Sequence, residues 1–357
     1  MVSGKERRVL ILADWDADGV ISAALVGYAQ EVKGRFPVQE RLKPDMLPVG
    51  PRSIQETVED LLEREGCWEH VVLLDIPYTE AVEAALKLIK EKCGSKIYYF
   101  DHHSSTVKNI THLEDEYNAY VVVGRSSTSV IVARFLEGLG VRVSPRLRDF
   151  AKAVGVLEGG ARKLKGDVSD GLVGVAASIS KSLNQMRSPD AWLRYVKWLM
   201  NPIPIEPARI DIGGEKRDLV SYGMEVSKQN DTEIKKVATE LAMSARNLGF
   251  IRFVDARDKW KRRGSSALTS AIYKILNTPV AALFEKEDGT RILIIRAGEG
   301  MAASIMDVLS EMEVVEEPGG HGNIAVAKLK DEVTVKRLEE SLRRAAFEAS
   351  RRRFHHA

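Results

Sequence analysis

Acidic residues and histidines follow three apolar stretches of the sequence, each at the point where the stretch ends. They are Asp14, Asp16 and Asp18 after residues 9–12, Asp75 after residues 71–74, and Asp101, His102 and His103 after residues 97–100. Carboxylates gathered in one place repel one another strongly, and divalent cations are the usual remedy. Histidine and carboxylate together are common ligands of manganese and zinc. The residue types therefore predict a site for two metal ions.

The apolar stretches predict the strands that position these groups, because short β-rich runs alternate there with segments of helical spacing. In a parallel sheet the loops at the carboxyl ends of the strands converge on one crevice. We therefore expect an α/β fold with a doubly wound parallel sheet. The expected strands are residues 9–12, 38–42, 71–74, 97–100 and 119–123, and the expected helices are 20–32, 53–65, 79–93 and 124–139.

The acidic loop at residues 14–18 has a simpler explanation as a helix cap, because carboxylates favour helix N-termini. A cap requires one or two acids, however, and three at alternate positions of an extended chain share one orientation. This favours metal binding. Trp15 either packs under the loop or stacks on a base. The hydroxyl groups of residues 126–128 are placed to cap the following helix.

The remainder of the chain predicts two further regions. Residues 1–188 form the expected metal-binding domain, whose last part is helical, and residues 189–240 form a helical connector with an irregular insert. Residues 241–357 return to a strand–helix pattern and form a smaller α/β domain. Its expected strands are 250–254, 280–284 and 291–296, and its expected helices are 301–309 and 333–351.

The composition bears on which partners the protein can bind and on where in the cell it is expected. Its 357 residues carry 53 basic and 51 acidic side chains, so any nucleic-acid binding must come from local patches. Residues 257–263 combine cations with Trp260 and are either such a patch or a solvated face. Two cysteines, Cys67 and Cys93, make no disulfide framework and no zinc set. With no signal peptide and no membrane-length apolar run, we expect a cytoplasmic protein without a membrane partner.

The ordered motifs resemble a known family. DWDADG at residues 14–19, a lone aspartate at 75 and DHH at 101–103 are similar to the DHH phosphoesterase superfamily, in the branch that contains the RecJ exonucleases. Gly-Gly-His at residues 319–321, preceded by Ile-Ile-Arg at 294–296, resembles the C-terminal DHHA1 domain of that family. The resemblance implies an active site in a cleft between two domains.

The resemblance also implies roles for individual residues. The implied catalytic residues are Asp75, Asp101 and His103. Asp75 would bridge two Mn²⁺ ions, with Mg²⁺ as a substitute, and His103 would lie against the metals and the scissile phosphate. The family's fourth motif carries an aspartate that is missing here, and Glu158 is the nearest acid, with Asp167 as a rival. The implied metal ligands are Asp14, Asp16, Asp18, Asp75, His102 and Glu158. The implied substrate-binding residues are Arg296, Gly319, Gly320, His321 and Asn323.

The resulting expectation is a manganese-dependent phosphodiesterase with a role in DNA repair. As an exonuclease it would release mononucleotides from single-stranded DNA or RNA, with 3′-to-5′ polarity favoured and a helicase or another replication or repair protein as a partner. One alternative is a phosphodiesterase for short oligoribonucleotides or cyclic dinucleotides. Another is a catalytically impaired DHH-fold scaffold of a replication or repair complex. The sequence leaves the oligomeric state open.

Overall fold

The computed structural model describes residues 8–158, 168–203, 209–212, 214–298, 300–321 and 323–354. The chain divides into two compact units, Met1–Ser227 and Lys228–Ala357, and the division falls within helix α10 (Leu219–Met243). The domain limits proposed from the sequence stay predictions. None of the described helices is long and apolar enough to cross a membrane.

The first unit is built on a five-stranded sheet in the order β2-β1-β3-β4-β5, and every neighbouring pair is parallel. The order reverses between β1 and β3, so this doubly wound sheet has its switch point there. The expected fold is confirmed. The strands are β1 (Val9–Ala13), β2 (Asp45–Pro48), β3 (His70–Leu74), β4 (Lys96–Asp101) and β5 (Tyr120–Val123).

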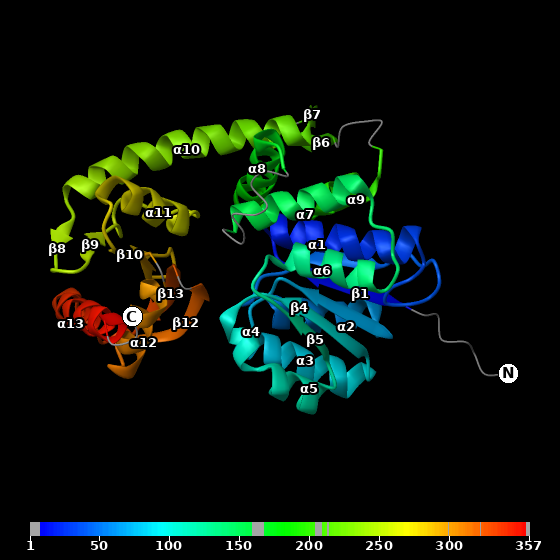
Figure 1. Ribbon diagram of the computed structural model, residues 1–357, viewed down its shortest axis with the longest axis horizontal. Coiled ribbons are helices and arrows are strands. Elements are labelled where there is room, and N and C mark those ends of the chain that lie inside the picture. Colours follow the sequence, from blue (N-terminus) through cyan, green and yellow to red (C-terminus); the bar gives the residue numbers. More distant parts are fainter. Residues whose placement is uncertain are drawn as a thin grey trace. The chain divides into compact units, whose positions relative to one another are not determined.

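Helices cover both faces of this sheet, as Figure 1 shows. Alternate strand residues face opposite sides, so Ile11 packs into one core and Leu10 and Leu12 into the other. The first core includes α1 (Ala17–Gly27), which continues as a π-helix (Tyr28–Val32), with α6 (Thr128–Gly138), α7 (Pro145–Leu157), α8 (Asp170–Met186) and α9 (Pro189–Met200). The second includes α2 (Ile54–Glu65), α3 (Glu80–Cys93) and α5 (Ile110–Tyr117).

One edge strand differs from the expectation. The predicted strand at residues 38–42 is wrong, and β2 lies a few residues later. The reason is Gln30, a fully buried side chain whose Oε1 accepts from Val38 N (2.9 Å) and whose Nε2 donates to Glu40 O. These bonds satisfy backbone groups that a strand would pair with its neighbour. Pro48 is tolerated in β2 because the strand lies at the edge of the sheet.

The second unit contains a mixed six-stranded sheet in the order β12-β13-β11-β10-β9-β8. The predicted strands at 280–284 and 291–296 are confirmed, whereas the β12–β13 hairpin was not expected. The strands are β8 (Arg246–Asn247), β9 (Arg252–Asp255), β10 (Val280–Glu285), β11 (Arg291–Arg296), β12 (Val315–His321) and β13 (Ile324–Leu329). Its other helices are α11 (Ser265–Leu276), α12 (Met301–Glu311) and α13 (Val335–Phe354). A separate hairpin in the first unit pairs β6 (Arg209–Ile212) with β7 (Glu215–Asp218).

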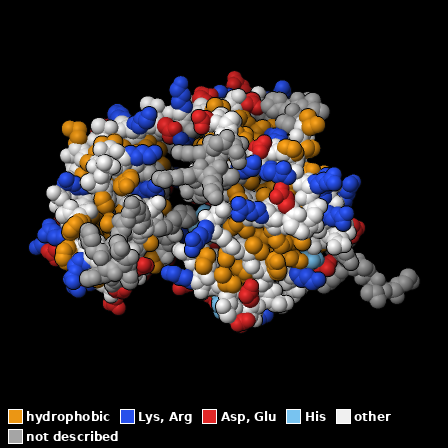
Figure 2. Space-filling view, viewed as in Figure 1, with side chains coloured by type: hydrophobic (Ala, Val, Ile, Leu, Met, Phe, Trp, Pro, Cys, Tyr) orange, Lys and Arg blue, Asp and Glu red, His pale blue; other side chains and the backbone are white. Residues whose placement is uncertain are grey.

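Charged side chains of both signs are interspersed over the face seen in Figure 2, in keeping with a net charge of +2.

In the second unit, Trp260 within the basic segment 257–263 is only 3% exposed, and the Cζ atom of Arg262 lies over its ring, 4.3 Å from the ring centroid. A ring packed in this way offers no open face to a base. The segment therefore does not form the stacking platform that its composition suggested.

Cys67 and Cys93 form a disulfide with a Cα–Cα distance of 5.3 Å, whereas no disulfide framework was expected from the sequence. Cys67 precedes β3, and Cys93 is the last residue of α3. In a β–α–β unit the helix returns the chain to the amino end of the sheet, which brings its last residue beside the start of the preceding strand. Spacing in the sequence could not reveal this proximity.

We expect Cys93→Ser to lower the free energy of unfolding by about 3 kcal/mol under non-reducing conditions, because the disulfide closes a loop with a sequence separation of 26. Chemical denaturation measures the change. A reductant should destabilise the wild-type protein by a similar amount and leave the variant unchanged. Equal stability of the two proteins without reductant would contradict the disulfide.

Candidate metal centre

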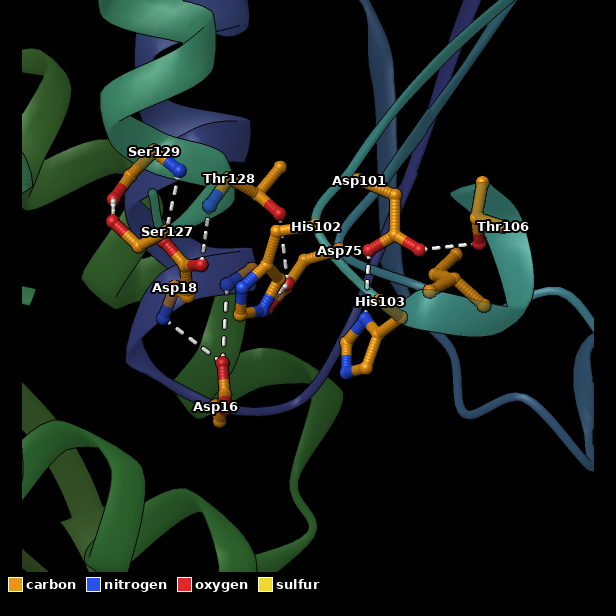
Figure 3. A network of polar contacts seen from close by, with 12 residues as sticks. Asp16, Asp18, Asp75, Asp101, His102, His103, Thr106, Ser127, Thr128 and Ser129 are labelled. Atoms are coloured by element: carbon orange, nitrogen blue, oxygen red, sulfur yellow. Dashed lines mark hydrogen bonds and ion pairs between the residues drawn. The ribbon is translucent and has the colours of Figure 1, made fainter. Parts of the chain in front are cut away.

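Carboxylates from two neighbouring strands meet at the switch point of the parallel sheet. Asp14 follows β1 and Asp75 follows β3. One potential ligand atom from each of Asp14, Asp16 and Asp75 lies within 4.8 Å of the others, and the same holds for Asp75, His102 and His103. Asp75 belongs to both groups. Figure 3 shows the network around it.

Asp75 has an unusual backbone conformation. Its φ of 61° lies in the left-handed region, a backbone conformation that residues with a Cβ rarely adopt. The residue is only 2% exposed, and its N–H donates to Phe100 O (3.0 Å). Its Oδ1 accepts from Thr128 Oγ1 (2.9 Å) and lies 3.4 Å from His102 Nε2. Such strain persists only where the surroundings fix it and is common at functional sites.

Asp16 and Asp18 each serve a helix N-terminus. Asp16 Oδ1 caps α1 by accepting from the backbone N–H groups of Asp18 (2.9 Å) and Gly19 (3.1 Å). Asp18 Oδ2 and Oδ1 accept from Thr128 N (2.7 Å) and Ser129 N (2.8 Å) at the start of α6. The predicted hydroxyl cap of α6 is therefore wrong, because the cap comes from α1. Each carboxylate oxygen has a further lone pair, so capping leaves acceptor capacity for a cation.

The acidic loop is held from two sides. Gly19 has no room for a side chain, because a Cβ there would lie 2.3 Å from Asp14 O. Trp192 of α9 donates from Nε1 to that same carbonyl oxygen (3.1 Å), and Ala17 N donates to Ser180 Oγ of α8 (2.8 Å). Trp15 is half-buried and packs against the apolar core, which agrees with the packing alternative.

Asp101 is fully buried and orients His103. His103 Nδ1 donates to Asp101 Oδ1 (2.7 Å), and the other carboxylate oxygen accepts from the Thr106 hydroxyl. Burial opposes protonation of the ring, but the negative charge and hydrogen bond of Asp101 prevail and raise the pKa of His103. Asp101 thus holds the His103 ring in place and favours its charged form.

The electrostatics of the cluster fit divalent cations. Burial and the negative charge of Asp16 raise the pKa of Asp14 and that of Asp18 to about 7. Burial and the surrounding carboxylates also raise the pKa of Asp75 well above its ordinary value. Burial and His103 lower the pKa of His102, which favours the neutral ring that a metal ligand needs. Cations would relieve this repulsion, so the donor set fits two metal ions.

Glu158 lies near the cluster but outside the two tight groups. It is the C-cap of α7, and much of the residue is exposed. Desolvation of its carboxyl group and the negative charges of Asp16 and Asp18 raise its pKa to about 8. Its role as a metal ligand stays a prediction. Asp167 lies outside the described residues.

Comparison with known proteins identifies the fold. No family model matches the chain, and no curated protein matches it. Among solved structures, a DHH-domain protein described as a member of a family of ribosomal proteins is 17% identical with a TM-score of 0.62, over 95% of this chain and 86% of that one. RecJ from Thermus thermophilus, solved with Mn²⁺, is 16% identical with a TM-score of 0.60, over 97% of this chain and 52% of RecJ.

The chain has a DHH-type, RecJ-like fold. A third similar structure is the pGpG-specific phosphodiesterase PggH from Vibrio cholerae, which is 12% identical with a TM-score of 0.52, over 97% of this chain and all of PggH. The chain spans about half the length of RecJ. The expected arrangement of a parallel-sheet domain and a smaller sheet-containing domain agrees with these structures.

The DHHA1-type residues of the second unit lie on neighbouring strands. Arg296 of β11 pairs in register with Ile324 of β13, which pairs with His321 of β12. Two strand spacings separate Arg296 from His321, so their backbones are about 10 Å apart. Gly320 has a φ of 114°, and a Cβ there would lie 2.3 Å from Ile324 O, so only glycine fits.

Asn323 has a positioning role in this hairpin. Its Oδ1 accepts from Gly300 N (3.0 Å), and its backbone carbonyl accepts from Ala297 N (3.1 Å). Gly319 pairs with Val326 in the same hairpin. Substrate binding by these residues stays a prediction.

Several supporting residues had no signal in the sequence. Thr106, Ser180 and Trp192 contact the acidic cluster or its loop through single hydrogen bonds. Thr128 was expected as a cap of α6, but the contact of its hydroxyl group with Asp75 was not expected. Hydroxyl and indole groups are common in any helix, so their identity alone indicated nothing. Only tertiary folding brings them to the carboxyl edge of the sheet.

We expect Asp101→Asn to lower the pKa of His103, because it removes the negative charge that favours the imidazolium form. An NMR titration of the metal-free protein measures the change. The ring signals of His112, which pairs with Glu83 at 3.0 Å on the surface, are the internal control and should be the same in the two proteins. An unchanged His103 titration would contradict the assigned interaction.

We also expect Mn²⁺ to stabilise the protein more at about pH 8 than at about pH 5.5. The folded pKa values of Asp14 and Asp18, about 7, lie above the ordinary value of 3.8. In the metal-free protein, the stability that these two groups contribute is therefore fully present below pH 3.8 and is lost as the pH rises through about 7. Cations restore it by binding the deprotonated groups. The thermal-shift difference between Mn²⁺ and chelator should grow with pH, and a constant difference would contradict this.

Proposed function

We propose that the protein is a divalent-metal-dependent phosphodiesterase that hydrolyses single-stranded DNA or RNA from an end and releases mononucleotides. The observation that carries this proposal is Asp75, whose carboxylate lies within 4.8 Å of ligand atoms from both Asp14 and Asp16 and both His102 and His103. A carboxylate with neighbours on two sides suits a bridge between two ions. The RecJ-like fold adds support.

Two divalent ions at such a site would lower the pKa of a bound water and offset charge that develops on the phosphate. The residues of the chain would hold and orient the reacting groups. Asp14, Asp16, Asp75 and neutral His102 would supply ligand atoms, with Asp18 and Glu158 as the remaining proposed ligands. Asp101 fixes the His103 ring and favours its protonated form, so His103 can donate a proton or a hydrogen bond to a phosphate oxygen.

The second unit is proposed to bind substrate phosphate. Arg296 lies at the end of β11 with its guanidinium 5.9 Å from the Tyr273 ring centroid. Gly319 and Gly320 permit close approach of a phosphate to the backbone. We propose that His321 joins them and that Asn323 acts by shaping the loop before α12. Manganese as the preferred ion, 3′-to-5′ polarity and a replication or repair partner belong to the same proposal.

A second candidate is a phosphodiesterase for short oligoribonucleotides or cyclic dinucleotides. It is favoured by the match to PggH, because the alignment covers the whole of that chain and nearly all of this one. The missing aspartate of the fourth motif favours the third alternative, a catalytically impaired scaffold. Substrate length and metal dependence distinguish the three.

The decisive assay is a time course on end-labelled DNA and RNA, from dinucleotides to strands of about thirty nucleotides, in Mn²⁺, Mg²⁺ or chelator. We expect metal-dependent release of mononucleotides from long strands, and the labelled end reveals the polarity. Cleavage limited to the shortest substrates would favour the second candidate. Binding of strands without cleavage would favour the scaffold and contradict the enzyme.

Asp75→Asn is the matched variant, because asparagine also tolerates the left-handed backbone and can accept from Thr128. We expect turnover to fall by more than about a hundredfold, since a neutral amide is a much poorer metal ligand. The metal-free variant should be at least as stable as the wild type, because one of the repelling charges is gone. Retained turnover would contradict the bridging role.

A further inference from the structure

A guanidinium group lies against the acidic loop of the metal centre. Arg187 follows α8, and its Cζ lies 5.1 Å from the centroid of the Trp15 ring. Trp15 stands between two of the carboxylates in the sequence. Burial and Asp16 raise the pKa of Asp14, and the positive charge of Arg187 acts against them. A cation is therefore placed next to the candidate metal ligands.

The backbone of Arg187 is in a conformation that its side chain does not favour. Its φ of 42° and ψ of 40° lie in the left-handed region, where it ends α8 by donating from N to Leu183 O (2.9 Å). Glycine or asparagine normally occupies this helix-ending position. An arginine there carries a backbone cost that glycine would avoid. This outlier calls for a role of the guanidinium itself.

The side chain is also fixed in place. Arg187 Nη2 donates to Asn184 Oδ1 (3.1 Å), and the guanidinium lies over the Trp15 ring. The corner between α8 and α9 is anchored on both sides of Arg187. Ser180 of α8 accepts from Ala17 N, and Trp192 of α9 donates to Asp14 O. The position of the guanidinium is thus defined relative to the acidic loop within the first unit.

We propose that Arg187 binds a phosphate group of the substrate beside the metal centre, and this inference rests on the proposed function. A phosphodiester is repelled by the carboxylates, and a planar guanidinium can bind phosphate through two parallel hydrogen bonds. Because the group is already ordered, little rotamer entropy is lost when phosphate binds. Arg187 thereby favours anionic phosphate ligands over uncharged nucleosides.

Two variants distinguish phosphate binding by Arg187 from a role in the fold alone. Arg187→Ala and Arg187→Gly both remove the guanidinium, but only glycine relieves the left-handed backbone. The glycine variant should therefore have a higher Tm than the alanine variant. If Arg187 serves only the fold, activity should follow stability. If it binds phosphate, both variants should be equally impaired. Arg187→Lys, which keeps the charge without the planar fork, should lie between them and the wild type.

The experiment measures binding of adenosine 5′-monophosphate and adenosine by calorimetry in Mn²⁺, together with KM and kcat on a labelled single-stranded oligonucleotide. We expect the alanine and glycine variants to bind the monophosphate about tenfold or more weakly, with adenosine unaffected. KM should rise by a similar factor with little change in kcat, because the contact is made equally before and during reaction. Asn118→Gly, at the left-handed C-cap of α5, is the control and should leave both readouts unchanged.

Three results would overturn the inference. The first is wild-type affinity for the monophosphate in Arg187→Gly, and the second is a defect in Arg187→Ala that glycine restores. The third is no measurable binding of the monophosphate by the wild type. Failure of the proposed function is distinct, because the wild type would then bind the monophosphate through Arg187 without hydrolysing any strand.

Discussion

Repulsion among carboxylates at the carboxyl ends of β1, β3 and β4 is the constraint on which the rest of the structure depends. The parallel sheet brings these groups to its switch point, where burial raises the pKa of Asp18 to about 7. The fold offsets the repulsion in several ways. The N-terminus of α6 donates two backbone N–H groups to Asp18, and Arg187 places a positive charge beside Asp14. The remaining negative charge is what makes the site suited to cations.

The constraint also explains the supporting structure. Asp75 is kept in a left-handed conformation, Gly19 admits no side chain, and α8 and α9 anchor the loop after β1. Each feature costs backbone freedom or leaves little tolerance for substitution. Together they hold the carboxylates in one place. Such preorganisation suits a site in which the geometry around the metal ions determines the chemistry.

The sequence predicted most of the fold that positions this site. Thr79 caps α3, accepting from Val82 N, and Gly94 ends it with a φ of 62°, as expected from local residue types. The prediction failed where a distant side chain decided the outcome. Residues 38–42 form a loop rather than the expected strand because Gln30 bonds their backbone. The N-terminus of α6 is capped by Asp18 of α1 rather than by the expected hydroxyl groups. The disulfide and Arg187 depend on tertiary neighbours in the same way.

The residue types predicted where the candidate site lies, but they did not predict the separate roles of its acidic residues. Spacing indicated three equivalent carboxylates after β1, whereas Asp16 and Asp18 also cap helices and Asp101 orients His103. Spacing carries no information on hydrogen-bond partners. If Asp75 joins two cation sites, equilibrium dialysis with Mn²⁺ should find about two ions per chain in the wild type, with at least one lost in Asp75→Asn. No bound Mn²⁺, or the same number in both proteins, would contradict this role of Asp75.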